Sequence, residues 1–280
     1  MKNVKLLLVL MAVALIAVSC GPKKEKSLKD ASKLVLYYSQ TGNTKAVAEE
    51  IATKLGADIE EITMVDPYDT AFQATIDRCM QEREQGIIPD IHPIKADIAS
   101  YDVIFLGFPV WFGTYAPPMQ KFLLSTDLSG KKIVPFCTFG SGGGESSVKD
   151  LRQAAPDAIV LPGYGVRAAR LEAMPKEIDN FLKSSGFLEG KVVHLEAFSE
   201  PHDVSEEEAA IFNAAIDGYP MLHAKAKTVA TRALPNGEEY LFTAEDLPRE
   251  DKPDMPPAGE IRVFVTVENN QAPVFTKVIR

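Results

Sequence analysis

The chain has 280 residues, enough for two domains of ordinary size, and 46% of them are hydrophobic, as in a globular protein. It carries 30 Lys and Arg against 39 Asp and Glu, a formal net charge of −9, and this acidic balance argues against nucleic acid as a partner. The three cysteines and four histidines show no ligand spacing, so the sequence predicts no metal site.

The first twenty residues resemble a bacterial lipoprotein signal peptide. Lys2 and Lys5 flank the start of an apolar run, residues 6–18, which ends in small residues and Cys20. We expect residues 1–19 to be cleaved, Cys20 to carry lipid, and residues 20–32 to form a tether in the bacterial cell envelope, on its periplasmic face or surface. The run is short for a membrane span, which weighs against a retained transmembrane helix. Ala17 departs from the Leu that is commoner three residues before such a cysteine.

Residues 33–186 alternate between apolar, strand-like runs and helical periodicity. The predicted strands are 33–39, 58–62, 103–107, 133–138 and 158–163, and the predicted helices are 44–55, 71–85, 117–124, 145–154 and 175–185. This order indicates an α/β fold, a doubly wound parallel sheet of five strands with both faces covered. Ligands bind such sheets at the carboxyl ends of the strands. We expect Cys79 and Cys137 to be buried and unpaired.

The first of these strands runs directly into a loop of hydroxyl side chains, and a helix follows at once. Backbone N–H groups at a helix start and the helix dipole favour a bound anion, and Gly42 permits a tight turn. The segment predicts a phosphate site made of Ser39, Gln40, Thr41, Gly42, Asn43 and Thr44. By itself it is also compatible with an ordinary strand-to-helix turn. Neither the Walker motif nor the dinucleotide glycine fingerprint is present.

Two further loops follow strands in the same way: Gly-Phe-Pro-Val-Trp-Phe-Gly at 107–113 and Thr-Phe-Gly-Ser-Gly-Gly-Gly at 138–144. With the Ser-Gln-Thr-Gly-Asn-Thr loop, they resemble the flavodoxin family in order and spacing over about residues 33–186. The resemblance implies FMN as cofactor, with its phosphate in the first loop and its isoalloxazine ring gripped by the other two. The implied ring-binding residues are Pro109, Val110, Trp111, Phe112, Gly113, Thr138, Gly140, Ser141, Gly142 and Gly143. It implies no catalytic side chain, because the flavin supplies the redox chemistry.

Several of these residues have simpler explanations. Trp111 either covers a flavin face or packs at the loop, and Phe112 either joins it or fills the core. Gly113 is a turn glycine, or its peptide flips beside the flavin N5 atom. The third loop lacks the Tyr that flavodoxins often stack on the ring, so that one ring face is either covered only by Trp111 or Phe112 or left open. Arg167 and Arg170 are expected on a solvated face.

After residue 186 the pattern changes. We interpret residues 187–203 as a linker and residues 204–280 as a second, small α+β domain. It opens with a helix capped by Ser205 and continues with predicted strands at 227–233, 238–244, 260–268 and 272–279, with a turn at Asn236-Gly237. One helix followed by a four-stranded meander resembles the cystatin-like fold. We expect an accessory module that docks a protein partner.

The sequence as a whole favours an FMN-binding, flavodoxin-like lipoprotein in electron transfer. It would act as a carrier or as a reductase component, serving a redox partner or a small quinone-like acceptor. The alternative is a flavin-free binding or structural lipoprotein that uses the same fold as a scaffold. The intact first loop favours the flavoprotein, and no feature separates carrier from reductase.

Overall fold

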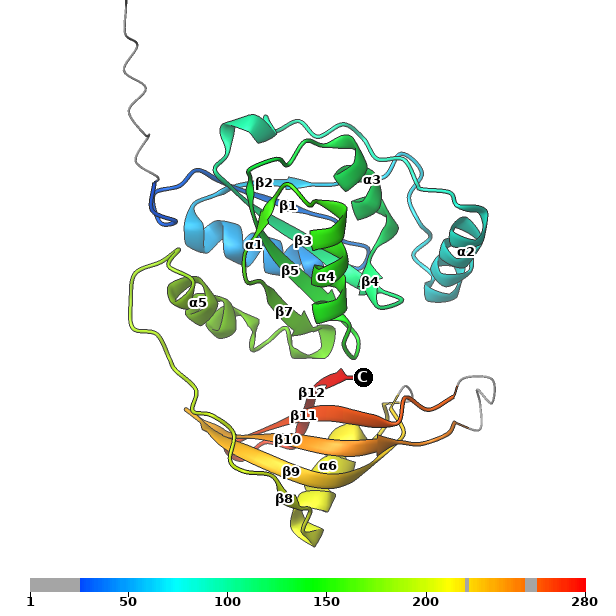
Figure 1. The fold of residues 1–280 in the computed structure, drawn as a ribbon, viewed down its shortest axis with the longest axis vertical. Helices are drawn as coiled ribbons and strands as arrows, with labels where there is room; N and C mark the ends of the chain where they lie inside the picture. Colours follow the sequence, from blue (N-terminus) through cyan, green and yellow to red (C-terminus); the bar gives the residue numbers. More distant parts are fainter. Residues whose placement is uncertain (1–25, 220–221, 250–255) are drawn as a thin grey trace, which may run out of the picture.

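The computed structural model describes residues 26–219, 222–249 and 256–280. Figure 1 shows an α/β domain above a smaller α+β domain. The expected signal peptide and Cys20 lie outside the described residues. Within the described ranges, the helices are too short or too polar to cross a bilayer.

The first domain is built on a parallel sheet with the strand order β2-β1-β3-β5, and β6 and β7 share the fifth position. This arrangement confirms the predicted α/β fold. The strands are β1 (Lys33–Tyr37), β2 (Asp58–Glu61), β3 (Val103–Trp111), β5 (Lys132–Phe139), β6 (Ile159–Val160) and β7 (Tyr164–Arg167), and a short β4 (Thr114–Tyr115) pairs antiparallel with β3. The helices are α1 (Asn43–Leu55), α2 (Phe72–Gln85), α3 (Pro117–Ser125), α4 (Gly144–Ala154) and α5 (Met174–Ser184), with single 3₁₀ turns at Ile98–Ser100 and Ala168–Arg170.

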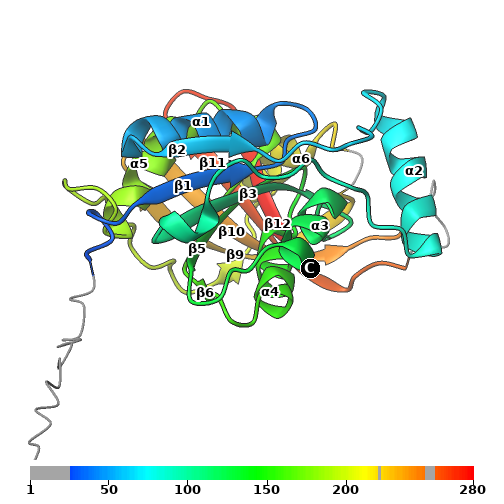
Figure 2. The same cartoon turned by 90° about the horizontal axis from the view of Figure 1, so that it is seen from above.

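Successive side chains of each central strand enter opposite cores, as a sheet covered on both faces requires. Leu34 and Leu36 of β1 join the core under α2, α3 and α4, whereas Val35 and Tyr37 join the core under α1 and α5. Figure 2 shows these two helix layers on either side of the sheet. Cys79 and Cys137 are buried and unpaired, as predicted.

The predicted fifth strand, residues 158–163, is wrong in its extent. It consists of two short strands, β6 and β7, both parallel to β5. Between them, a methyl group added at Gly163 would lie 2.2 Å from the carbonyl oxygen of Pro135, so Pro135 turns its backbone toward this gap. Because proline has no N–H to donate, the ladder is interrupted there.

The second domain is an antiparallel sheet with the order β12-β11-β10-β9-β8 and one helix, α6, packed on it. The strands are β8 (His202–Asp203), β9 (Ala224–Leu234), β10 (Gly237–Asp246), β11 (Glu260–Glu268) and β12 (Val274–Ile279), and α6 spans Glu206–Ile216. Ser205 and Glu208 form a reciprocal capping box at the start of α6. The two-residue strand β8 was not predicted; it lies inside the segment interpreted as a linker. In the same segment, Phe187 is buried in the core of the first domain.

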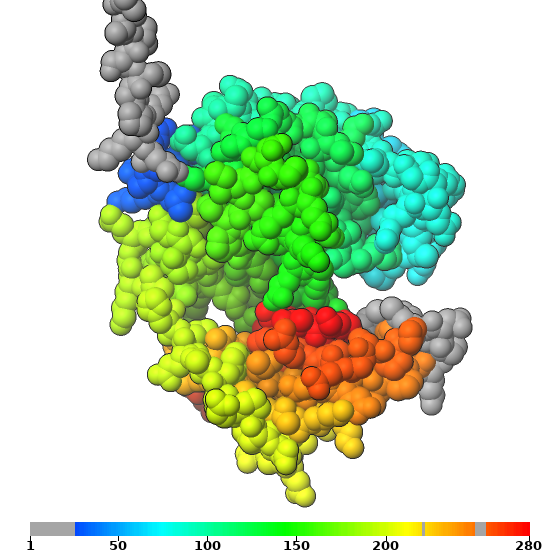
Figure 3. Space-filling view, viewed as in Figure 1, coloured from blue at the N-terminus to red at the C-terminus, as the bar shows by residue number. Residues whose placement is uncertain are grey.

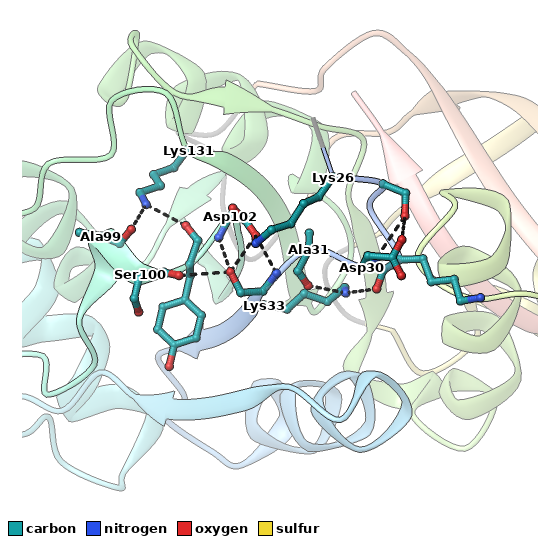
Figure 4. A network of polar contacts seen from close by, with 12 residues as sticks. Lys26, Asp30, Ala31, Lys33, Ala99, Ser100, Asp102 and Lys131 are labelled. Atoms are coloured by element: carbon teal, nitrogen blue, oxygen red, sulfur yellow. Dashed lines mark hydrogen bonds and ion pairs between the residues drawn. The ribbon is translucent and has the colours of Figure 1, made fainter. Parts of the chain in front are cut away.

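The chain enters the first domain at the amino ends of the strands. Asp102, just before β3, accepts hydrogen bonds from Lys26 Nζ at 2.8 Å and from the amide and hydroxyl of Ser32, each at 2.9 Å (Figure 4). The bond from Lys26 is the largest of the effects that hold the pKa of the Asp102 carboxyl well below its usual range. Nearby, Lys131 Nζ donates to the carbonyl oxygens of Ala99 and Tyr101. The segment that leads in from the N-terminus is therefore attached at the edge opposite the carboxyl ends.

Candidate functional site: three loops at the carboxyl edge of the sheet

The structure brings the three predicted loops together at the carboxyl edge of the parallel sheet. We name them the first loop (residues 39–44), the second loop (107–113) and the third loop (138–144). The hydroxyl oxygens of Thr44 and Thr138 lie 2.9 Å apart and link the first loop to the third. Ser146, in the first turn of α4, donates to the carbonyl oxygen of Gly113 at 2.6 Å and links α4 to the second loop.

The first loop forms an open cradle at the start of α1. Gly42 has φ of 86°, and a methyl group added there would meet nothing within 4 Å. Ser39 Oγ accepts from the amide of Lys45 at 3.2 Å, whereas the amides of residues 41–44 donate to no protein group among the described residues. Free amides at a helix N-terminus favour an anion, so the loop fits a phosphate group.

Two side chains of the first loop are hydrogen-bonded to other groups of the protein. The amide of Gln40 donates to the carbonyl oxygen of Asp69 at 2.8 Å and accepts from the Tyr38 hydroxyl at 2.7 Å. Thr44 is buried, and its hydroxyl faces Thr138. The groups open to a phosphate are therefore the backbone amides together with the side chains of Thr41, Asn43 and Ser39.

The second loop is the tip of a hairpin that the sequence did not predict. β3 continues to Trp111, and Phe112 and Gly113 turn the chain into β4 with φ of 50° and 82°. Two successive positive φ values are typical of a type I′ turn, and a phenylalanine in that conformation is strained. Phe112 is also 49% exposed and does not fill the core, and the Arg83 guanidinium lies 5.2 Å from its ring centre. A strained, exposed aromatic residue at a loop tip is a candidate for ligand contact.

Trp111 is partly buried and packs edge-on against two tyrosines. Its ring centre is 5.2 Å from that of Tyr68 and 6.2 Å from that of Tyr38. Burial and a hydrogen bond to Glu82 raise the pKa of Tyr68, so its hydroxyl stays neutral. Sequence reasoning missed both tyrosines. Tyr38 is signalled by its position directly before the first loop, but nothing in the sequence marks Tyr68.

The third loop touches the second. A methyl group added at Gly143 would lie 2.8 Å from Val110 Cγ1 and 3.3 Å from Gly113 Cα. A planar ring between two groups needs about 7 Å, twice a carbon–carbon contact distance of roughly 3.5 Å. A ring bound at this site therefore does not pass between Gly143 and Val110. Phe139, the aromatic residue of the third loop, is buried in the core of the first domain, so this loop offers no exposed aromatic side chain for the second ring face.

A cavity of about 780 Å³ lies next to these loops, between α4, β7 and the C-terminal strand β12. Gly113 and residues 141–143 border it, and no residue of the first loop does. Cys137 also lines the cavity, and burial raises the pKa of its thiol to about 12. No group of three His, Cys, Asp or Glu side chains suited to a metal ion occurs in the described parts of the chain.

Comparison with known proteins identifies the family of the first domain. A family model described as Flavodoxin matches residues 32–184, more than half of the chain. A flavoprotein from Bacteroides eggerthii DSM 20697 is 28% identical, with a TM-score of 0.50 over 55% of this chain and 98% of that one. A second, from Bacteroides uniformis ATCC 8492, is 27% identical with a TM-score of 0.48 over 53% and 97%. A flavoprotein from Lactobacillus acidophilus NCFM, in complex with FMN, is 24% identical with a TM-score of 0.46 over 53% and 97%. The chain belongs to the flavodoxin family.

Proposed function

We propose that the first domain binds FMN and that the protein transfers electrons. The observation that carries the proposal is the convergence of the three loops, joined by the Thr44–Thr138 contact and by the Ser146–Gly113 hydrogen bond. Membership of the flavodoxin family supports FMN as the cofactor. FMN would supply the redox chemistry, and the chain would supply binding, orientation and electrostatics.

In this proposal the first loop holds the phosphate and the second and third loops hold the ring. Backbone amides at the start of α1 and the hydroxyl of Thr41 bind the phosphate. Both groups donate hydrogen bonds, and such bonds are strong when the acceptor is an anion. Trp111 and Phe112 border the ring from the second loop. One ring face is left without an aromatic cover from the third loop, which admits a second planar molecule such as a quinone-like acceptor.

We place the protein in the bacterial cell envelope, anchored by lipid at Cys20. The tether enters at the amino edge of the sheet, where Lys26 pairs with Asp102. The FMN loops lie at the opposite edge, so the anchor leaves them free for a redox partner. The acidic chain is no partner for nucleic acid.

We assign the second domain to a cystatin-like accessory module. The assignment is supported by the element order, in which one helix is followed by the antiparallel strands β9 to β12. The helix packs on the sheet, and the ring centres of Phe212 in α6 and Phe242 in β10 lie 5.0 Å apart. Among its described residues no group of His, Cys, Asp or Glu side chains is suited to a metal ion. Its surface is a candidate for contact with a protein partner.

The absorption spectrum of the protein, purified from a host that makes FMN, tests the central claim. We expect a flavin spectrum and release of one FMN per chain on denaturation. A colourless protein that also fails to bind added FMN favours the flavin-free scaffold. Carrier and reductase are then separated by adding a quinone to the reduced protein and following its reoxidation.

A further inference from the structure

The two domains meet at the third loop. In Figure 1, β12 runs just below α4 and β7, and in Figure 3 its atoms touch those of the α/β domain. The amide of Val278 in β12 donates to the carbonyl oxygen of Ser141 at 2.8 Å. Lys277 Nζ lies 3.6 Å from a carboxylate oxygen of Glu145, the second residue of α4.

Arg167, at the end of β7, joins the domains from the other side of the loop. Its Nε donates to the carbonyl oxygen of Gly140 at 2.7 Å, and its Nη1 donates to the carbonyl oxygen of Phe275 in β12 at 2.9 Å. The guanidinium lies 4.5 Å from the ring centre of Phe275 and 4.7 Å from that of Tyr219. Arg167 thus contacts both the third loop and the aromatic pair Tyr219 and Phe275 of the second domain. The prediction that Arg167 lies on a solvated face is wrong.

Gly142 marks how closely the loop approaches β12. A methyl group added at Gly142 would lie 2.3 Å from the carbonyl oxygen of Val278, which is a backbone atom and cannot swing away. β12 is the edge strand of its sheet, and Val278 turns its N–H and C=O away from β11 and toward the loop. The third loop therefore covers a free strand edge, a common way to protect one. Gly142 is required by this contact, independently of any flavin.

A loop with glycine at positions 140 and 142–144 is costly to order, because glycine loses more conformational freedom than any other residue. If such a loop were free, a ligand would have to fix it on binding and would lose affinity accordingly. Here the carbonyl oxygen of Ser141 accepts a hydrogen bond from β12 of the second domain. The carbonyl oxygen of Gly140 accepts from Arg167, which in turn binds Phe275 of the second domain. The loop is ordered before a ligand arrives.

We propose that the second domain is a positioning element of the flavin site: Arg167 and the free edge of β12 fix the third loop, and this contact sets flavin affinity and reduction potential. The inference rests on the proposed FMN site. It gives the second domain a role in the redox chemistry without a contact to the flavin itself, and it makes Arg167 a positioning residue.

Two substitutions in the full-length protein break the contact from opposite sides. Gly142→Ala places a methyl group against Val278, and Arg167→Met removes both hydrogen bonds while it keeps a long apolar stem. Ser129→Thr is the matched control for the first, since it also adds one methyl group, but at an exposed position between α3 and β5. Arg152→Met, on the exposed face of α4, controls for the second.

Three quantities are measured on each protein: amide hydrogen exchange, the Kd for FMN and the midpoint potential. Amide hydrogen exchange of residues 138–144 without FMN is expected to be roughly tenfold faster in both test variants, because each loses stabilising contacts of the loop. The Kd for FMN is expected to rise roughly five- to tenfold, with a shifted midpoint potential. Both controls should match the parent in every measurement.

Unchanged exchange in both test variants overturns the proposal, because the second domain then does not fix the loop. Faster exchange with the affinity and potential of the parent also overturns it, since the contact is then structural only. A parent that binds no FMN overturns the proposed function instead, and the flavin part of this inference falls with it. If Gly142→Ala fails to fold, Arg167→Met carries the test.

Discussion

The hydroxyl oxygens of Thr44 and Thr138 lie 2.9 Å apart, which ties the start of α1 to the end of β5 across the carboxyl edge of the sheet. Both side chains are buried, with exposed fractions of 1% and 3%. A buried hydroxyl without a partner costs free energy, so each of these two residues satisfies the other. The contact holds the first and third loops in fixed relation before any ligand binds.

A double-mutant cycle tests this contact. Thr44→Val or Thr138→Val leaves one hydroxyl buried without its partner and should lower the free energy of unfolding by about 1–3 kcal/mol. The double variant should lose less than the sum of the two, because replacing both partners by apolar groups of similar shape is nearly neutral. Urea denaturation gives the values, and Thr53→Val, exposed on the same helix, is the control. Strict additivity would show that the two hydroxyls do not interact.

The exposed hydroxyl of the first loop should matter for phosphate and not for the ring. Thr41→Ala removes a charge-assisted hydrogen bond of about 1.5–3 kcal/mol, so the Kd for FMN should rise roughly 10- to 150-fold. Riboflavin, which lacks the phosphate, should bind the variant and the parent equally. Fluorescence titration with both ligands measures this, with Thr53→Ala as control. An equal loss for both ligands would place Thr41 against the ring.

The buried thiol of Cys137 should make the free energy of unfolding depend on pH in the alkaline range. Burial raises the pKa of its thiol from 9.0 to about 12, so the folded protein keeps a proton that the unfolded chain releases. The stabilising contribution is fully present below pH 9 and is lost as the pH rises toward 12. The free energy of unfolding should fall more steeply between pH 9 and 10 in the parent than in Cys137→Ala, by about 1 kcal/mol. Identical slopes would mean that Cys137 ionises freely in the folded protein.

Much of the fold was predictable because its signals are local. The buried runs of β1, β3 and β5 and the helices between them follow from periodicity, and the three loops from their position after strands. The aromatic site around Arg167 was not predictable, because residues 167, 219 and 275 meet only through docking of the two domains. The break between β6 and β7 depends on which way Pro135 faces, which the sequence does not state.

The lipid anchor is a separate prediction. Cys20→Ala should release the protein from the membrane fraction or leave it with its leader attached, because stable anchoring requires the acyl chains at that residue. Cell fractionation and the mass of the N-terminal peptide provide the measurement. Cys79→Ala, at a buried position in α2, is the control and should remain in the membrane fraction. A parent found soluble with an unmodified Cys20 contradicts the anchor.

Replacing Phe112 should raise the stability of the FMN-free protein and weaken FMN binding. Its φ of 50° disfavours any residue with a Cβ, and its ring is 49% exposed, so the fold gains little from it. Phe112→Gly relieves the backbone strain, which should raise the free energy of unfolding of the FMN-free protein by about 1 kcal/mol. The same substitution removes an aromatic contact with the ring and should weaken FMN binding by roughly fivefold or more. Phe112→Ala separates the two effects, because it removes the ring but keeps a Cβ at positive φ. If Phe112→Ala loses FMN affinity without the gain in stability, the phenylalanine is retained for the ligand. If both variants bind FMN like the parent, the strain at Phe112 has another cause.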